Sequence, residues 1–147
     1  MRIASYNVNG VNGRLGHLLD WLGDTAPDIV CLQELKSESF PARALEAAGY
    51  GAVWHGQKSW NGVAILGRDV TPIETRRGLP GEPDGAPARY IEAAVKGVLV
   101  GCLYAPNGNP VGSAKYAAKI EWYARFVAHA DALLATGHPV ALVGDYN

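Results

Sequence analysis

Short apolar runs recur along the chain and are separated by polar or amphipathic stretches. The runs hold five to seven residues and are rich in valine, isoleucine and leucine, a pattern typical of strands buried in a sheet. The strands are expected over the ranges 2–7, 29–34, 51–55, 62–67, 89–95, 98–104 and 140–144. Lys96 and Gly97 separate two of these ranges, so a tight turn is expected there.

Amphipathic stretches lie between the apolar runs and predict helices. In the first of them, leucines recur at positions 15, 18, 19 and 22, a spacing that places side chains on one face of a helix. Ser113 is a favourable N-cap for the longest stretch, and Pro41 opens the shortest one. The helices are expected over the ranges 13–26, 41–50 and 113–134.

The order of strands and helices predicts an α/β fold. Residues 75–88 and 105–112 are rich in glycine and proline and are expected to form surface loops. Several strands are apolar on both faces and therefore need cover on both sides of the sheet. We expect a mixed sheet with helices on one face and no partner for the other face within this chain.

The composition is that of an ordinary soluble domain. The chain has 147 residues, of which 48% are hydrophobic and 18% charged, and its formal net charge is −1. This balance neither requires a polyanionic partner nor excludes one. Cys31 and Cys102 lie inside apolar runs, which predicts buried thiols in a reducing compartment and no zinc site. No signal peptide or membrane span is recognisable, so a cytoplasmic protein without a membrane partner is expected.

Polar side chains end four of the apolar runs, where strand formation does not require them. Asn7, Glu34 and Tyr104 each end one run. Asp145 ends the last run, two positions before Asn147. In open α/β sheets, ligands bind beyond the ends of the strands. If these strands are neighbours, their polar ends converge on one site.

The chemistry of this set points to a phosphoester. Glu34 and Asp145 are hard oxygen ligands suited to Mg²⁺. Asn7 and Asn147 can orient a carboxylate or a water without adding charge, and Tyr104 can donate to an anionic oxygen. The set fits metal-assisted attack of water on a phosphodiester. Taken singly, Glu34 could be a solvated edge residue, Asp145 a turn cap and Tyr104 an ordinary strand aromatic.

These residues fall within five segments that resemble the exodeoxyribonuclease III branch of the endonuclease/exonuclease/phosphatase superfamily. In chain order, the segments are ASYNVNG, PDIVCLQELK, WNGVAIL, YAPNG and VGDYN. Five motifs in order over the whole chain are specific, whereas a single Gln-Glu or Gly-Asp pair is a weak signal. The fold that the resemblance implies is a four-layer α/β sandwich, in which two sheets pack face to face with helices outside.

The resemblance implies a role for each matching residue. Asn7 would orient the catalytic centre, Glu34 would bind the metal ion, and Tyr104 would contact the scissile phosphate. Asp145 would position or activate the attacking water, and Asn147 would hydrogen-bond to the phosphate or the nucleophile. The implied cofactor is Mg²⁺, with Mn²⁺ as an alternative.

Three further residues are expected to bind the substrate. Lys36 and Asn107 match the motifs, and Arg89 follows Pro-Ala where the family often has Glu-Gly. For Lys36 and Arg89, a plain surface charge is the alternative interpretation. Leu35 and Tyr146 also depart from the family, which usually has threonine and phenylalanine at these positions.

The second half of the family fold is missing after Asn147. That half would supply further strands, another metal-site aspartate and a Ser-Asp-His motif. None of the four histidines in the chain, His17, His55, His129 and His138, is assigned to catalysis. We therefore expect residues 1–147 to be the N-terminal part of a single domain, half of the sandwich, with the second sheet missing from this chain. A C-terminal half or a complementing chain would supply the rest.

The function predicted by the resemblance is Mg²⁺-dependent hydrolysis of DNA phosphodiester bonds in repair, with duplex DNA as the partner. The reaction would be cleavage at abasic sites, 3′→5′ exonuclease action, or both. The isolated chain is expected to be inactive. Two alternatives stay open: a metal-dependent phosphatase or phospholipase of the same superfamily, and a non-catalytic fragment or module.

Overall fold

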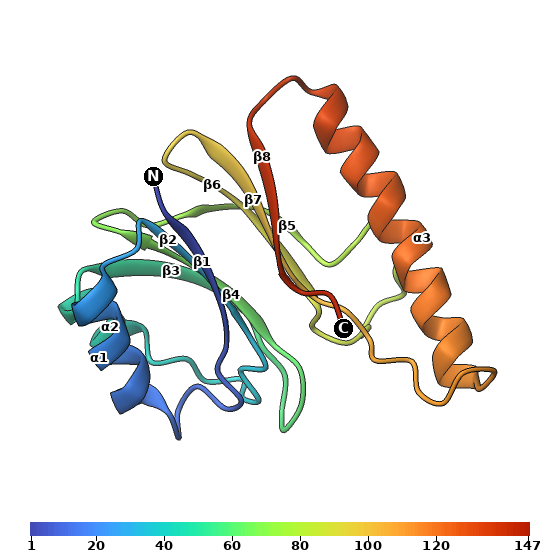
Figure 1. Cartoon of the computed structure of the whole chain (residues 1–147), viewed down its shortest axis with the longest axis horizontal. Coiled ribbons are helices and arrows are strands. Elements are labelled where there is room, and N and C mark those ends of the chain that lie inside the picture. Colours follow the sequence, from blue (N-terminus) through green and yellow to red (C-terminus); the bar gives the residue numbers. More distant parts are fainter.

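The computed structural model describes all residues from Met1 to Asn147. Two four-stranded sheets pack face to face, with strand orders β1-β2-β4-β3 and β5-β6-β7-β8. Helices α1 and α2 cover the outer face of the first sheet, and α3 covers the outer face of the second (Figure 1). The strands are β1 (Ile3–Asn7), β2 (Ile29–Gln33), β3 (Tyr50–His55), β4 (Val63–Arg68), β5 (Ile73–Arg77), β6 (Tyr90–Val95), β7 (Val98–Tyr104) and β8 (Val140–Asp145). The helices are α1 (Leu15–Thr25), α2 (Ala42–Ala47) and α3 (Ala114–Ala135).

Both sheets are mixed, so the predicted α/β class with mixed strand pairing is confirmed. β1 pairs with β2 and β8 with β7 in parallel, and the other pairs are antiparallel. The expectation that one sheet face lacks a partner in this chain is wrong, because β5 to β8 form a second sheet that covers it. An apolar run indicates that a strand is buried on both faces, but it does not indicate which other strands bury it.

The two sheets bury an apolar layer between them. Ile29, Cys31 and Ile65 of the first sheet pack with Ile91 and Cys102 of the second, and all five are fully buried. Every residue of β2 is buried, which explains why its first four residues are apolar. Both cysteines are free and buried, as predicted.

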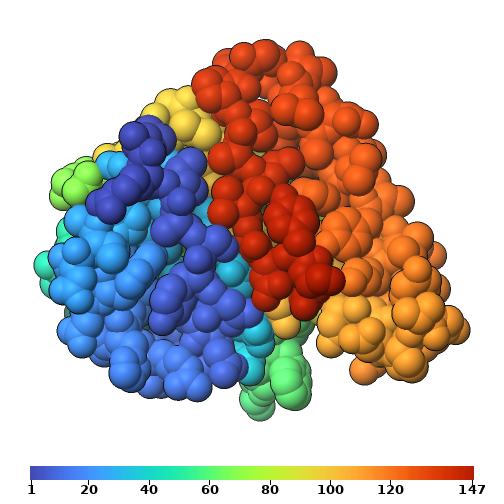
Figure 2. Space-filling view, viewed as in Figure 1, coloured from blue at the N-terminus to red at the C-terminus, as the bar shows by residue number.

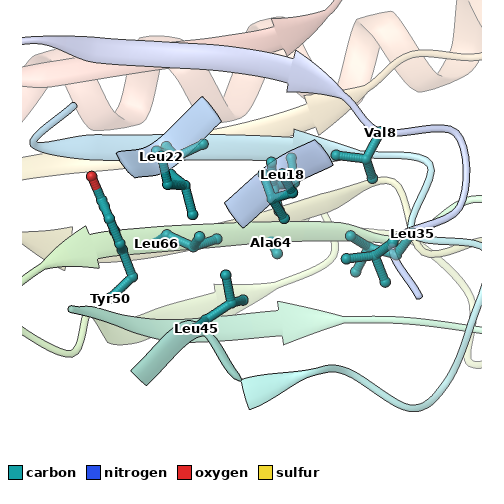
Figure 3. Close-up of a cluster of buried hydrophobic side chains, with 11 residues drawn as sticks. Val8, Leu18, Leu22, Leu35, Leu45, Tyr50, Ala64 and Leu66 are labelled. Atoms are coloured by element: carbon teal, nitrogen blue, oxygen red, sulfur yellow. The ribbon is translucent and has the colours of Figure 1, made fainter. Parts of the chain in front are cut away.

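Leucines of α1 and α2 cover the outer face of the first sheet (Figure 3). Leu18 and Leu22 of α1 and Leu45 of α2 pack with Ala64 and Leu66 of β4, and each is at most 2% exposed. Burial of a leucine side chain contributes roughly 1.5–3 kcal/mol. The leucine spacing that predicts α1 therefore marks the face that packs on the sheet.

The long helix α3 packs on the second sheet through one stripe of its surface. Trp122 and Phe126 are buried together with Tyr90 of β6. The predicted N-cap is confirmed, because Oγ of Ser113 accepts a hydrogen bond from the backbone N–H of Tyr116 at 3.3 Å. Neither α3 nor any other helix is both long and apolar enough to cross a membrane.

One strand lies where the sequence predicts a loop. The last three residues of β5 lie in the range 75–88, and four of its five residues are exposed. As an exposed edge strand, β5 lacks the apolar run that marks the buried strands. The predicted turn between β6 and β7 is confirmed, with φ of 50° at Lys96 and 81° at Gly97.

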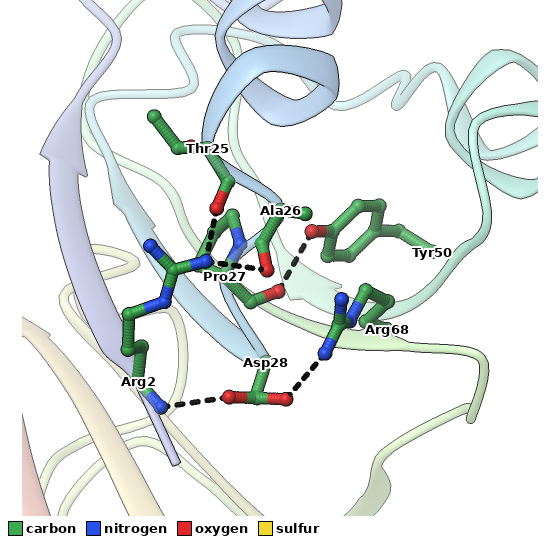
Figure 4. Close-up of polar contacts among 7 residues, drawn as sticks. All are labelled: Arg2, Thr25, Ala26, Pro27, Asp28, Tyr50 and Arg68. Carbon is green, nitrogen blue, oxygen red and sulfur yellow. Dashed lines mark hydrogen bonds and ion pairs between the residues drawn. The ribbon is translucent and has the colours of Figure 1, made fainter.

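A polar cluster around Asp28 holds the start of β1 (Figure 4). The Asp28 carboxylate accepts hydrogen bonds from the backbone N–H of Arg2 and from the guanidinium of Arg68, both at 2.7 Å. The Arg2 guanidinium donates to the carbonyl groups of Thr25 and Ala26. These bonds join β1, β4 and the end of α1, so they fix the direction in which β1 enters the sheet.

Two strand edges lie open on one side of the molecule. β1 pairs only with β2, and β8 pairs only with β7. Figure 2 shows β1 in dark blue and β8 in red next to each other on the near face, with no segment over them. An open edge carries backbone N–H and C=O groups without a strand partner.

Candidate active site

The ends of β1, β2, β7 and β8 bring the predicted residues to one edge of the molecule. Asn7 pairs with Gln33 at the ends of β1 and β2, and Tyr104 pairs with Asp145 at the ends of β7 and β8. Both pairs are parallel and β1 lies beside β8, so the four strands end together (Figure 1). The predicted convergence of the strand ends is therefore observed.

Asn7 joins the two candidate carboxylates. Its Nδ2 donates hydrogen bonds to Oε2 of Glu34 at 2.5 Å and to Oδ2 of Asp145 at 3.0 Å. Its Oδ1 accepts a hydrogen bond from the backbone N–H of Asn9 at 3.1 Å, which fixes the orientation of the amide. Both carboxylates therefore lie within hydrogen-bonding distance of one nitrogen, although they come from different sheets.

A strained segment after β2 presents Glu34. Glu34 and Lys36 adopt left-handed backbone conformations, with φ of 56° and 55°. Non-glycine residues in such conformations cost about 1–3 kcal/mol each and cluster at functional sites. The backbone N–H of Gly10 donates to the Glu34 carbonyl at 2.8 Å, and that of Lys36 donates to the Asn61 carbonyl at 2.9 Å. Neighbouring loops therefore hold the strained segment in place.

Lys36 lies between a carboxylate and an exposed aromatic ring. Its Nζ is 3.5 Å from Oε1 of Glu34 and donates to Oδ1 of Asn9 at 2.5 Å. The same Nζ lies 5.9 Å from the ring centre of Trp60, which is 68% exposed. A cation and a flat apolar surface are thus available next to Glu34.

Tyr104 and Arg89 border the carboxylates from the second sheet. Nη1 of Arg89 donates to the Tyr104 carbonyl at 3.1 Å, and the guanidinium carbon lies 5.1 Å from the centre of the Tyr104 ring. Burial raises the pKa of Tyr104, and the negative charges of Glu34 and Asp145 raise it further. The phenol therefore stays protonated at neutral pH and can donate a hydrogen bond.

The last residues of the chain are held from α3 and from the turn after β7. Nδ2 of Asn147 donates to the Ala105 carbonyl at 2.6 Å, and its backbone N–H donates to Oδ1 of Asp145 at 3.1 Å. Nζ of Lys119 donates to the carbonyl of Asn147 at 2.9 Å and to that of Asn107 at 3.3 Å. Lys119 thus connects the Asp145 segment with the Asn107 turn.

The sequence pattern of the Endonuclease/Exonuclease/phosphatase family matches residues 4–147. The chain belongs to this family. Exodeoxyribonuclease III of Haemophilus influenzae is 33% identical over 155 residues, which cover 100% of this chain and 57% of that relative. The resemblance to the exodeoxyribonuclease III branch is thereby confirmed.

Solved structures of similar proteins superpose closely on this member of the Endonuclease/Exonuclease/phosphatase family. The 3′-5′ exonuclease NExo of Neisseria meningitidis gives a TM-score of 0.94 at 40% identity, covering 100% of this chain and 58% of its own. NExo from Neisseria, described as a 3′ phosphatase bound to a product DNA hairpin, gives a TM-score of 0.92 at 40% identity. The match covers 98% of this chain and 56% of NExo. An AP endonuclease of Archaeoglobus fulgidus gives a TM-score of 0.80 at 38% identity. The match covers 86% of this chain and 49% of the endonuclease. The chain thus spans about half the length of the proteins it matches.

The resemblance to the Endonuclease/Exonuclease/phosphatase family implies a divalent metal ion, and the donors in this site fit one. Mg²⁺ takes one or two protein carboxylates and leaves its other positions to water and phosphate. Glu34 and Asp145 offer that number of carboxylates at one amide. No group of three or more His, Cys, Asp or Glu side chains able to hold a metal ion occurs in the chain. The donor set therefore suits a hard cation with open positions better than a closed zinc site.

The predicted site residues fall into two groups. Hydrogen bonds and an ion pair link Asn7, Glu34, Lys36, Asp145 and Asn147 into one network. Tyr104, Arg89 and Asn107 border this network without a bond to either carboxylate. The structure brings all eight to one edge of the molecule, and their chemical roles stay predictions.

Two other residues complete the network and are not predicted from the sequence. Asn9 bonds both Asn7 and Lys36, and its only signal is its position two residues after Asn7 in the first motif. Lys119 has no local signal, because its contacts depend on where α3 lies relative to the strand ends.

Proposed function

We propose that this chain carries part of the active centre of a hydrolase that cleaves phosphodiester bonds of DNA in repair. The observation that carries the proposal is the bonding of one Asn7 amide to the carboxylates of Glu34 and Asp145. The relatives support DNA as the substrate, because they are named as an exodeoxyribonuclease, a 3′-5′ exonuclease and an AP endonuclease. Those names favour cleavage at abasic sites, 3′→5′ exonuclease action, or both.

The side chains of the candidate site have different roles in the proposed hydrolysis. Asp145 orients the attacking water and accepts its proton, and the Asn7 amide holds that carboxylate in place. Tyr104 donates a hydrogen bond to a phosphate oxygen as negative charge builds there, because its raised pKa keeps the phenol protonated. Asn147, bonded to Asp145, offers a further amide donor beside the phosphate.

Glu34, with Asp145 close to it, would hold the divalent metal ion. When bound, Mg²⁺, or Mn²⁺ in its place, supplies positive charge that stabilises the phosphoryl oxygens. Asn7 keeps the two carboxylates at one neutral donor, which limits their repulsion.

Cationic and aromatic side chains near the carboxylates would bind duplex DNA. Lys36 and the exposed Trp60 lie on the Glu34 side, and Arg89 lies on the Tyr104 side. Asn107 adds an amide in the turn after β7. Contacts of this kind address the phosphate backbone, so they confer affinity that falls with salt and carries little sequence preference.

We further propose that residues 1–147 are the N-terminal part of a larger domain and that the isolated chain is inactive. The chain covers 57% of the Haemophilus relative, and β1 and β8 have open edges. A C-terminal half, or a separate complementing chain, that adds strands to these edges would satisfy their backbone groups. The same strands end at Asn7 and Asp145, so added strands would bring further side chains to the site.

The test measures DNA cleavage by the chain with and without a complementing segment. The substrates are a duplex with an abasic site and a duplex with a recessed 3′ end, each with Mg²⁺ or EDTA. The complement is the part of NExo beyond the matched region, produced together with this chain. We expect no cleavage by the chain alone and cleavage by the complemented protein, abolished by EDTA and by Glu34→Ala. Glu46→Ala, an exposed position on α2, serves as the control and should keep activity.

Three results count against these proposals. A complemented, folded protein that leaves both duplexes intact contradicts the nuclease function. Cleavage that survives EDTA or Glu34→Ala contradicts the metal-dependent site. Metal-dependent cleavage by the chain alone contradicts its inactivity but supports the function.

Removal of a 3′ phosphate from DNA is a second candidate activity of the same site. NExo is described both as a 3′-5′ exonuclease and as a 3′ phosphatase. The residues proposed for the diester can attack a phosphomonoester in the same way. A third duplex with a 3′ phosphate distinguishes the two activities, because phosphatase action releases inorganic phosphate without shortening the strand.

We also propose that the protein acts in the cytoplasm. Cys31 and Cys102 are free, buried thiols, which supports a reducing compartment. Cell fractionation tests this location: the protein is expected in the cytosolic fraction, and recovery in a membrane or secreted fraction would contradict it.

A further inference from the structure

A cavity of about 410 Å³ lies next to the candidate active site. Three segments surround it: residues 82–89 before β6, residues 104–108 at the end of β7 and just beyond it, and one face of α3. Tyr104 and Arg89 belong both to this cavity and to the candidate active site. None of the lining residues belongs to β1 or β8, so the cavity does not depend on the open sheet edges.

Charged side chains line the cavity without pairing with one another. The cations are Arg89, Lys115 and Arg125, and the anions are Glu82 and Glu121. None of the five takes part in an ion pair. Burial lowers the pKa of Arg89 and raises that of Glu82, so both groups are partly removed from water. Partly buried charges that lack an ion-pair partner gain free energy from a ligand of opposite charge.

Much of the remaining wall is apolar and rigid. Pro83, Pro87 and Pro106 contribute stiff ring surfaces, and Trp122 contributes its indole. Trp122 is only 5% exposed and stacks on Phe126, with ring centres 5.5 Å apart. A planar ring can rest against such a surface without ordering it further. The cavity volume falls within the range of about 300–1,000 Å³ that is usual for small-molecule sites.

We propose that this cavity binds a nucleoside monophosphate. Arg89 and Arg125 would pair with the phosphate, since the guanidinium fork matches phosphate oxygens. Trp122 and the prolines would contact the base, and Glu82 would accept hydrogen bonds from its N–H groups or from the sugar. A mononucleotide is what 3′→5′ exonuclease action releases, so the identity of the ligand rests on the proposed function. The cavity would hold the released nucleotide beside the site that produces it.

Nuclear magnetic resonance of the indole N–H groups tests binding without cleavage. The chain has four tryptophans, so a ¹⁵N-labelled sample gives four indole signals. Trp122→Phe assigns the signal that reports on the cavity. The titrants are dAMP, deoxyadenosine and inorganic phosphate, each with EDTA present so that no metal ion holds a ligand at Glu34.

We expect dAMP to shift the Trp122 signal with a Kd at least about tenfold below those of deoxyadenosine and inorganic phosphate, because both its parts contact the cavity. Arg125→Gln should raise the Kd for dAMP about tenfold through the loss of a charge-assisted hydrogen bond. Lys115→Gln, at an exposed position of α3, should also raise it and carries little risk to folding. Arg43→Gln, an exposed position of α2, is the control and should leave the Kd unchanged.

Four results would overturn the proposal. The first two are equal affinity for dAMP and inorganic phosphate, and a Kd for dAMP that neither variant changes. The other two are the absence of a shift of the Trp122 signal at millimolar dAMP, and loss of dAMP binding in Glu34→Gln. The last result would place the ligand at the carboxylates instead. The titration contains EDTA and measures no cleavage, so a negative result does not argue against the proposed hydrolysis. Conversely, a chain that cleaves no DNA does not argue against nucleotide binding in the cavity.

Discussion

Asn7 and Asp145 are separated by 138 positions, yet Nδ2 of Asn7 donates a hydrogen bond to Oδ2 of Asp145 at 3.0 Å. The bond connects the two sheets, because Asn7 ends β1 and Asp145 ends β8. The same nitrogen reaches Oε2 of Glu34 at 2.5 Å. One neutral donor therefore sets the relative position of two carboxylates without adding a charge.

Removal of this donor should impair catalysis far more than folding. In the complemented protein, Asn7→Ala is expected to lower kcat on the abasic duplex by about 10²-fold, because the carboxylates lose a preorganised partner. The free energy of unfolding should fall by less than about 1 kcal/mol, because Asn7 is exposed. Asn12→Ala removes an exposed amide that bonds Ser37 and serves as the control. Activity of Asn7→Ala equal to that of the unsubstituted protein would remove Asn7 from the mechanism.

Gly144 determines how closely β8 approaches β7 just before Asp145. Its φ is 154°, and a Cβ at this position would lie 2.0 Å from the carbonyl oxygen of Leu103. Gly144→Ala is therefore expected to lower the free energy of unfolding by about 3 kcal/mol, measured by urea denaturation. Gly13→Ala is the matched control, because nothing lies within 4 Å of a Cβ at Gly13. If both variants were equally stable, the close contact between β7 and β8 would not be required for folding.

The sequence predicts the buried strands and misses the exposed one for a single physical reason. β2 and β4 are largely apolar runs that are buried, whereas β5 is an exposed edge whose residues include Glu74, Arg76 and Arg77. The stacking of two sheets is not predictable in this way, because Ile29 and Ile91 meet only after the strands have chosen their partners. The local apolar pattern thus indicates which strands are buried, whereas the sheet topology determines which strands pack against them.

The candidate site follows the same division. Glu34 and Asp145 stand out because each carboxylate lies at the end of a largely apolar run and has no role in the strand itself. The link from Lys119 to Asn107 and Asn147 could not be predicted, since it depends on the placement of α3 over the second sheet. The resemblance to known motifs specifies the reaction more closely than the apolar pattern does. The residue roles that it implies are still predictions.

Glu92 anchors α3 through a buried polar cluster. Glu92 is 4% exposed, and its carboxylate accepts hydrogen bonds from Thr75 and Tyr90 at 2.6 and 2.9 Å and lies 2.6 Å from Nε2 of His129. Burial by itself raises the pKa of Glu92, but the bonds from Thr75, His129 and Tyr90 lower it below the ordinary value. His129→Ala should lower the free energy of unfolding by about 2–3 kcal/mol, because it leaves a buried carboxylate short of a partner.

Thermal and urea unfolding of His129→Ala check this expectation. His17→Ala removes an exposed histidine of α1 and should leave stability within about 0.5 kcal/mol of the original. Equal stabilities of the two variants would show that α3 is held by its apolar stripe alone.

Asp28 makes the free energy of unfolding depend on pH in the acidic range. The hydrogen bonds from the Arg2 backbone N–H and the Arg68 guanidinium lower the pKa of Asp28. A carboxyl group with a lower pKa in the folded chain contributes stability above its unfolded pKa of about 3.9, and this contribution is lost as the pH falls through the folded pKa. Asp28→Asn should therefore reduce the difference between the unfolding free energies at neutral pH and at about pH 3. Asp24→Asn, exposed on α1, should keep the original difference, and an undiminished difference in Asp28→Asn would refute the argument.

The claim that Glu34 and Asp145 share one divalent cation is tested most directly by Mn²⁺ broadening of backbone amide signals in the ¹⁵N-labelled chain. Substoichiometric Mn²⁺ should broaden the signals around Glu34 and those around Asp145 together, since a cation held by Glu34 would lie beside the Asp145 carboxylate. Glu34→Gln and Asp145→Asn should each weaken Mn²⁺ binding about tenfold or more, whereas Glu46→Gln should not. Broadening around only one of the two carboxylates, or binding that neither substitution weakens, would contradict the account.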